Sequence, residues 1–281
     1  MHIKESNVLL RKTAFACALL AALVGCRDTS DPETEIEATP DLTHGRIAGT
    51  VTTPDGTPIS GVEVTTQDEL ATTGEDGGYV LQDIDPAKDV GLTFNKRGYA
   101  RTHSNVALHS WETATSNVAM LPIDGSGTFN SQAGGAVIVG DVRAFFPSNG
   151  VADSTGAGYT GEVTVEITHV DPNTDEILGA PGDLKARGDL DGVETTLQLV
   201  SYGMVDITLY GEDDQSLNVA EGKLAQIQLP IGNGDLPADL TLLPGMEAPT
   251  WSFDPLQGLW VQEGVGNVTT TEQGVTVLEF P

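Results

Sequence analysis

The sequence predicts an all-β protein in which two β-sandwich domains follow a secretion signal and a disordered tether. The 281-residue chain contains 33 glycines and 15 prolines, which suits many short strands joined by tight turns. Its segments rich in valine and threonine alternate apolar and polar side chains, as strands with one buried face do. Between residues 45 and 123 no apolar period of 3.6 residues persists for three turns.

Residues 1–25 have the features of a secretory signal peptide. Three basic residues precede a 12-residue apolar run, Thr13 to Val24, which is too short to span a bilayer as a mature helix. The run closes on Leu-Val-Gly-Cys at residues 23–26. This sequence resembles a bacterial lipobox, in which signal peptidase II cleaves before the cysteine and the cysteine sulfur carries a diacylglycerol. We therefore predict Sec export and lipidation at Cys26, with a signal cut elsewhere or a buried helix as the alternatives.

The residue after Cys26 is Arg27. An aspartate at this position would resemble an inner-membrane retention signal, and the chain does not have one. A lipid-anchored, acylated protein of a Gram-negative outer membrane is therefore favoured. Residues 26–44 are rich in acids, contain two prolines and carry few apolar side chains, which predicts a disordered acidic tether. Cys17 would leave with the signal, so no disulfide is expected.

Charge limits the possible partners. The chain has 13 basic and 41 acidic residues and a net charge of −28. Three of the basic residues and one acid lie in residues 1–25, so the mature chain would be more acidic still. Such a surface repels nucleic acid and anionic head groups. The expected partners are the membrane, through the lipid anchor alone, and a protein or polysaccharide.

Residues 45–123 should form the first domain. Arg46 to Thr53 alternates, a Pro-Asp-Gly-Thr-Pro turn follows, and Gly61 to Thr65 alternates again. Three further strands are expected at Val90 to Phe94, Tyr99 to Val106 and Thr115 to Leu121. The alternating positions that should face one core are Val51, Val62, Val64, Tyr79, Leu81 and Phe94.

Three of these segments carry a family resemblance: GTVTTPDGTPISGVEVTT, TTGEDGGYVLQDI and GLTFNKRGYA. Together they resemble the carboxypeptidase regulatory-like domain. The resemblance implies a transthyretin-like, seven-stranded Greek-key sandwich, a carbohydrate-binding-like fold. It also implies an accessory or interaction module without catalytic residues.

Residues 124–134 are rich in glycine and serine and are expected to be a mobile, cleavable linker. Residues 135–281 then predict a second β-rich domain. Its strands are expected at 136–145, 161–170, 195–199, 204–210 and 224–229, with an extended acidic loop at 173–192.

The second domain resembles the one that follows a similar sandwich in cartilage intermediate layer protein. The pieces that carry the resemblance are GEVTVEITHVDP, APGDLKA, LVSYGMVDITLYGEDDQSLNV, AQIQLPI and SFDPLQGLWVQEGVG. Relatives continue beyond a strand like Gly274 to Phe280. We therefore expect the domain to be incomplete at its C-terminus, with an unpaired edge strand.

Catalytic motifs are missing from the sequence, which contains no Gly-x-Ser-x-Gly elbow, Walker loop, dinucleotide fingerprint or zinc-spaced cluster. We therefore predict that the protein is not an enzyme, although a triad could still assemble from distant residues. No cofactor is expected except calcium, for which Asp189, Asp191 and Glu194 offer oxygen ligands. The alternative for these three residues is a turn with exposed acids.

Trp251 and Trp260 flank the turn formed by residues 254–258. Exposed aromatic faces suit a carbohydrate-binding surface, whereas buried ones would fill a core. The sequence therefore predicts a non-catalytic envelope lipoprotein that acts as a binding or structural module. The alternative is a carbohydrate-binding surface protein of a degradative or adhesive assembly.

Overall fold

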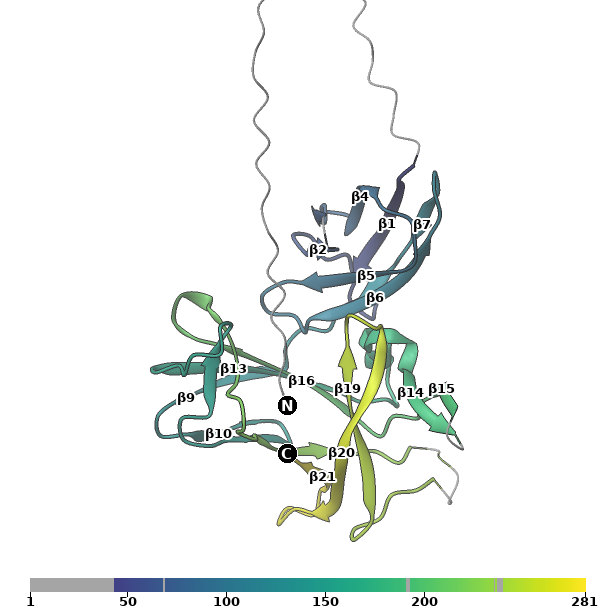
Figure 1. Ribbon diagram of the computed structural model, residues 1–281. Coiled ribbons are helices and arrows are strands. Elements are labelled where there is room, and N and C mark those ends of the chain that lie inside the picture. Colours follow the sequence, from purple (N-terminus) through teal and green to yellow (C-terminus); the bar gives the residue numbers. More distant parts are fainter. Residues whose placement is uncertain (1–42, 68, 191–192, 235, 237–239) are drawn as a thin grey trace, which may run out of the picture. The chain divides into compact units, whose positions relative to one another are not determined.

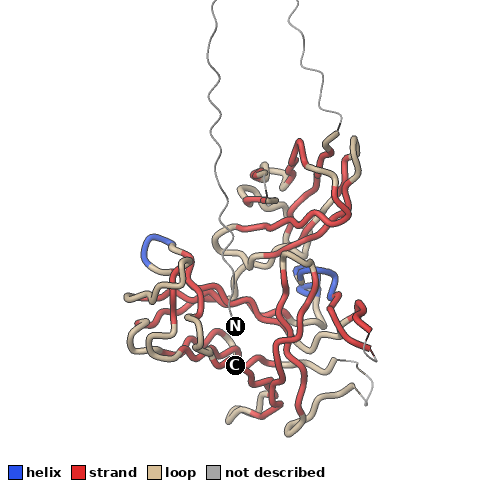
Figure 2. The backbone as a smooth tube through the Cα atoms, viewed as in Figure 1, coloured by secondary structure: helices blue, strands red, loops and turns tan. Residues whose placement is uncertain are grey.

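Strands dominate the described part of the chain, and helical segments are few and short (Figure 2). The computed structural model describes residues 43–67, 69–190, 193–234, 236 and 240–281. Residues 41–281 form one compact unit. The all-β prediction is confirmed, and no helix in the described ranges is long and apolar enough to cross a membrane. The predicted signal, Cys26 and most of the tether lie outside the described residues.

Eight strands build residues 45–121. They are β1 (Gly45–Thr52), β2 (Glu63–Thr65), β3 (Leu70–Thr72), β4 (Gly78–Ile84), β5 (Ala87–Asn95), β6 (Thr102–Leu108), β7 (Thr113–Thr115) and β8 (Val118–Ala119). One sheet has the order β4-β1-β7, with β8 also paired to β1, and the other has the order β3-β2-β5-β6. The short strands β7 and β8 both run parallel to β1 and follow each other along it. Counted as one interrupted strand, they give the seven-stranded sandwich that was expected (Figure 1).

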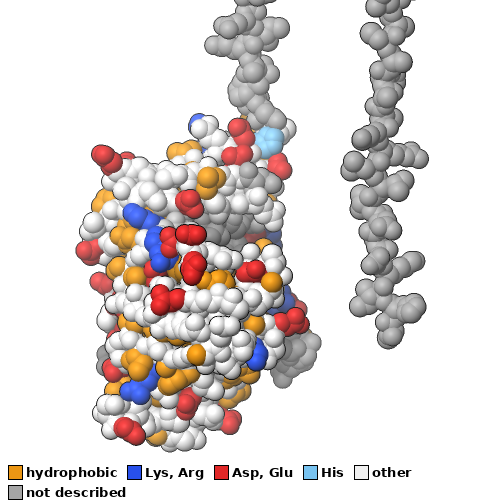
Figure 3. Space-filling view, turned by 90° about the vertical axis from the view of Figure 1, so that its left-hand side faces the viewer, with side chains coloured by type: hydrophobic (Ala, Val, Ile, Leu, Met, Phe, Trp, Pro, Cys, Tyr) orange, Lys and Arg blue, Asp and Glu red, His pale blue; other side chains and the backbone are white. Residues whose placement is uncertain are grey.

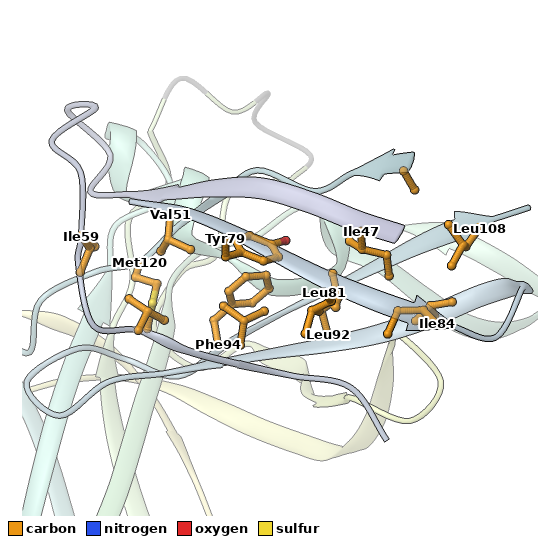
Figure 4. Close-up of a cluster of buried hydrophobic side chains, with 14 residues drawn as sticks. Ile47, Val51, Ile59, Tyr79, Leu81, Ile84, Leu92, Phe94, Leu108 and Met120 are labelled. Atoms are coloured by element: carbon orange, nitrogen blue, oxygen red, sulfur yellow. The ribbon is translucent and has the colours of Figure 1, made fainter. Parts of the chain in front are cut away.

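The two sheets enclose a core of alternating side chains. All six residues predicted to face it are buried there, and Val51, Val62 and Phe94 are 0% exposed. Figure 4 shows Tyr79 and Phe94 side by side, with their ring centroids 5.7 Å apart in an edge-to-face arrangement. The Tyr79 hydroxyl donates a hydrogen bond to the Ser116 carbonyl at 2.8 Å. Because burial outweighs that bond, the pKa of Tyr79 rises to about 12.

The rest of the unit is built by strands β9 to β21 and three short 3-10 helices. The strands are β9 (Gly125–Asn130), β10 (Gly135–Val139), β11 (Val142–Phe146), β12 (Val151–Asp153), β13 (Glu162–Val170), β14 (Lys185–Leu190), β15 (Val193–Gln198), β16 (Met204–Tyr210), β17 (Ser216–Val219), β18 (Gln226–Pro230), β19 (Glu247–Asp254), β20 (Leu259–Thr270) and β21 (Thr276–Phe280). The 3-10 helices are η1 (Asp175–Gly179), η2 (Pro181–Leu184) and η3 (Glu212–Asp214).

These strands also form two sheets. One has the order β12-β17-β16-β13-β9, and the other has the order β10-β11-β18-β21-β20-β14-β15, with β19 paired to β20. Side chains from both sheets share a second core, whose largest part includes Phe129, Val165, Leu209 and Ile227. A second sandwich-like layer arrangement therefore follows the first.

One turn recurs 100 residues later in the chain. Residues 51–59 and 151–159 both carry a glycine with positive φ at the sixth position, Gly56 (φ 87°) and Gly156 (φ 85°). The same three backbone hydrogen bonds close both turns: Thr53 N to Thr57 O, Gly56 N to Thr53 O and Ile59 N to Val51 O in the first, and Asp153 N to Ala157 O, Gly156 N to Asp153 O and Tyr159 N to Val151 O in the second. The two parts thus share a local structure as well as a layer arrangement.

The structure corrects the linker expected at residues 124–134. Residues 125–130 are strand β9, which pairs with β13 along its whole length. A Cβ atom at Gly127 would lie 2.8 Å from the side chain of Val137, and one at Gly125 would lie 3.0 Å from that of Val139. The glycines that suggested a linker are therefore explained by close packing between strands.

Two further expectations are corrected. The acidic stretch 173–192 is not one extended loop, because it contains η1, η2 and strand β14, which pairs with β15. The last strand, β21, is not an unpaired edge, because it lies between β18 and β20 and pairs with both. The expected single strand at 136–145 is the hairpin β10–β11.

Candidate functional site

A cleft of about 640 Å³ brings together residues from β6, β16, β19 and β20. Sites for small molecules typically measure about 300–1,000 Å³, so the cleft can admit a ligand of that class. Its walls come from segments far apart in the sequence: the start of β6 supplies one side, and the β19–β20 hairpin supplies another. Figure 1 shows that hairpin extending toward β5 and β6.

Aromatic rings form one wall of this cleft. Trp251 and Phe253 lie two residues apart on β19, so they share a face of the strand. Trp260 is directly opposite Phe253 on β20, and the two ring centroids are 5.8 Å apart. The ring of His103 stacks on the other side of the group, 5.6 Å from Phe253. All four side chains line the cleft and are half-buried.

The orientation of Trp260 is fixed by its surroundings. Its indole Nε1 donates a hydrogen bond to the Pro181 carbonyl at 3.0 Å. At the neighbouring Gly182, with φ of 68°, a Cβ atom would lie 2.2 Å from the Phe253 ring, so the backbone of η2 packs directly on the aromatic wall. Trp251 and Trp260 also line a smaller apolar cavity of about 150 Å³.

Polar groups line the same cleft. Arg101 is exposed, whereas Asp206 and Thr208 on β16 are half-buried. The Thr208 hydroxyl donates to Asp206 Oδ2 at 3.1 Å. Burial raises the pKa of Asp206, whereas the hydrogen bond from Thr208 and the nearby Arg101 charge oppose that rise.

His103 belongs to the aromatic wall rather than to the charged groups. Burial, assisted by the positive charge of Arg101, lowers the pKa of His103 to about 4. Its Nδ1 is 3.1 Å from the Thr93 hydroxyl. The imidazole is therefore neutral at pH 7. At that pH the cleft offers flat, uncharged rings beside one guanidinium and one carboxyl group.

The structure answers the metal prediction only in part. Asp191 lies outside the described residues, while Asp189 and Glu194 are opposite each other on β14 and β15. Glu194 Oε1 is 3.4 Å from Arg187 Nε, in an exposed ion pair. Within the described ranges no group of three His, Cys, Asp or Glu side chains could hold a metal ion.

Sequence reasoning singled out Trp251 and Trp260, and the structure places both at the cleft. It missed Asp206 on β16, His103 on β6 and Arg101, which directly precedes β6, because these residues meet the β19–β20 hairpin only in the folded chain. Their spacing carries no motif. The only signal in the sequence was the scarcity of basic residues, which makes each arginine a candidate for binding an anionic group.

Comparison with known families assigns the first sandwich. The family model of the carboxypeptidase regulatory-like domain matches residues 46–121. Residues 46–121 form a carboxypeptidase regulatory-like domain. The prediction for residues 45–123 is thereby confirmed to within two residues at each end, and residues 122–281 lie beyond the matched segment. None of the curated proteins matches the chain.

Solved structures resemble the chain only distantly. A Bacteroides uniformis protein provisionally named a carbohydrate binding protein has 11% identity and a TM-score of 0.23, with 85% of this chain and 96% of that one covered. A DUF3823 family protein from Parabacteroides merdae has 12% identity and a TM-score of 0.24, with 67% and 91% covered. Scores this low establish no shared arrangement of the two chains.

Proposed function

We propose that the protein is a non-catalytic binding module of the bacterial cell envelope and that the cleft walled by Trp251, Phe253 and Trp260 is its binding site. The observation that supports this proposal is the meeting of three aromatic side chains with Arg101 and Asp206 in one concave site. Binding sites combine apolar and aromatic walls with a few polar groups that fix the ligand's orientation.

Among ligand classes, the cleft favours a saccharide. The flat apolar faces of sugar rings suit aromatic walls, and their hydroxyl groups suit carboxyl and guanidinium partners. Accessory modules of the carboxypeptidase regulatory-like type are compatible with this role. A purely structural role of the aromatic group is the competing proposal, because Trp260 is already hydrogen-bonded to Pro181.

Tryptophan fluorescence can separate the two roles. We expect soluble oligosaccharides to change the emission of the wild-type protein in a saturable manner. We expect Trp251→Ala to weaken that binding about 2- to 10-fold, since an aromatic contact contributes about 0.5–1.5 kcal/mol. Trp111→Ala is the control, because Trp111 is 71% exposed and does not line the cleft. Unchanged affinity in the Trp251 variant, or equal losses in both, would contradict the proposal.

The envelope location rests on the lipobox-like sequence that ends at Cys26. Two or more acyl chains anchor a protein stably, at about 0.8 kcal/mol per buried CH₂ group. We expect Cys26→Ser to remain unprocessed and unlipidated. A variant that is still cleaved and still partitions into detergent like the wild type would refute lipidation at this residue.

We also propose that residues 125–281, the segment expected at 135–281 with strand β9 added, form a second module similar to the domain of cartilage intermediate layer protein. The shared core of their two sheets and the recurring turn at residues 151–159 support a second sandwich. Expression of residues 45–123 alone tests the boundary. A fragment that does not fold would refute two independent modules.

A further inference from the structure

Most basic side chains of the described residues form hydrogen bonds or ion pairs with other groups. Of the nine Lys and Arg side chains in the described ranges, six form hydrogen bonds or ion pairs: Arg46, Lys96, Arg97, Arg143, Lys185 and Arg187. The other three, Lys88, Arg101 and Lys223, have no such partner among the described residues. In a chain with a net charge of −28, the described residues therefore offer only three basic side chains without a partner.

Only one of these three cations lines the aromatic cleft. Arg101 does so, whereas Lys88 lines a different hollow and Lys223 lines neither. The guanidinium of Arg101 is close enough to Asp206 and His103 to influence both electrostatically. It nevertheless forms no ion pair within 4.0 Å with any described carboxylate. Its five N–H donors therefore remain available to a ligand.

The other ionisable groups in and near the cleft repel an incoming anion only weakly. His103 is neutral at pH 7 and contributes a ring. Asp206 is the acid that faces Arg101, and its oxygen already accepts the Thr208 hydroxyl. Burial disfavours the charged form of Asp206, which lessens its repulsion of an anion. Glu166, which also influences Asp206, is held by Arg97 Nε at 3.2 Å.

We propose that the cleft binds an anionic saccharide, with a carboxylate or sulfate group of the sugar paired to Arg101 and a sugar ring against Trp251, Phe253 and Trp260. This inference rests on the binding role proposed above. A planar guanidinium binds a carboxylate or sulfate through two parallel hydrogen bonds, which a neutral hydroxymethyl or ester group cannot replace. In this proposal the aromatic wall binds the sugar ring, and Arg101 makes the site specific for acidic over neutral sugars.

The test uses the folded chain without its signal and matched pairs of sugars. Trigalacturonate and its fully methyl-esterified form differ in charge and share a ring skeleton. A sulfated trisaccharide and its unsulfated parent distinguish sulfate from carboxylate. We expect at least one acidic form to bind about 10- to 100-fold more tightly than its neutral partner, as a charge-assisted pair predicts.

Three variants locate this preference. Arg101→Gln should remove this preference, because it should weaken binding of the acidic sugar far more than binding of the neutral one, while Arg101→Lys should keep part of it because the charge remains. Lys223→Gln is the matched control, since it removes an unpartnered cation outside the cleft. Circular dichroism confirms that each variant is folded.

The outcomes separate this inference from the binding role. If acidic and neutral sugars bind equally, or Arg101→Gln and Lys223→Gln reduce the preference to the same extent, the anionic ligand is refuted and the binding role stands. If neither acidic nor neutral sugars bind, the saccharide-binding role fails as well.

Discussion

Arg97 joins the carboxypeptidase regulatory-like domain to the strands that follow it, and its removal gives a quantitative test of the structure. Arg97 Nε is 3.2 Å from Glu166 Oε1 on β13, and Nη2 is 3.4 Å from Asp214 Oδ1. The guanidinium also lies 3.8 Å from the ring centroid of Tyr210. One side chain on the turn between β5 and β6 thus contacts three side chains of the second part.

The cost of Arg97→Gln follows from the exposure of its partners. The side chain of Glu166 is 8% exposed, that of Arg97 is 45% exposed and that of Asp214 is 74% exposed. Breaking a fully buried pair costs about 3–5 kcal/mol. Because Arg97 is half in solvent, we expect about 2 kcal/mol from Glu166 and about 0.5–1 kcal/mol from the stacking on Tyr210. The pair with Asp214 should contribute less than about 0.5 kcal/mol.

Urea unfolding followed by tryptophan fluorescence measures this cost. We expect Arg97→Gln to lose about 2.5–3.5 kcal/mol of unfolding free energy, about 5–14 °C in melting temperature for a unit of this size. The double variant Arg97→Gln/Glu166→Gln should lose about 1–2 kcal/mol less unfolding free energy than the sum of the two single variants, because both substitutions remove the same interaction. Asp214→Asn is the control. A loss below about 0.5 kcal/mol in Arg97→Gln, or additive losses in the double variant, would refute the reasoning.

Three further predictions concern the first sandwich. Tyr79→Phe should cost about 1–2 kcal/mol in urea unfolding, because it leaves the buried Ser116 carbonyl without its 2.8 Å hydrogen bond; an unchanged midpoint would contradict this. Gly49→Ala should cost about 3 kcal/mol, since its Cβ would lie 1.8 Å from the Ser116 carbonyl oxygen; a wild-type melting temperature would show that the strands can separate there. In the folded protein the pKa of His103 is lowered to about 4. As the pH drops from about 6.5 to 4, His103 is therefore protonated in the unfolded chain before it is protonated in the folded one, and the free energy of unfolding should fall by roughly 2 kcal/mol. His103→Gln should lose less stability over that range, and equal slopes in both proteins would contradict the assignment.

Local pattern was sufficient for much of the first sandwich. Residues 46–53 alternate in the sequence, and β1 occupies Gly45–Thr52 with Ile47 and Val51 fully buried. A side-chain period of two assigns every second residue to the core without knowledge of the partner strand. Gly77, in the turn before β4, adopts a positive φ of 74°. This turn links strands of different sheets, since β3 pairs with β2 and β4 pairs with β1.

Local pattern failed where pairing decides the structure. Strand β9 is rich in glycine and β14 reads Lys-Ala-Arg-Gly-Asp-Leu, so neither has the apolar alternation of a typical strand. Both become strands because a neighbour satisfies their backbone hydrogen bonds, β13 in one case and β15 in the other. The residues of β9 and β14 alone do not show which strand will pair with them.

The sequence by itself was enough to predict the β architecture, the family of the first sandwich and the acidic surface. It also identified Trp251 and Trp260 as candidate binding residues. The face shown in Figure 3 carries scattered acidic side chains and fewer basic ones. Only the tertiary structure placed Arg101 and Asp206 in the same cleft as Trp260, and only it paired Arg97 with Glu166. Alternation is a property of neighbouring residues, whereas a cleft depends on which distant strands are brought together, and that is decided by the packing of the whole unit.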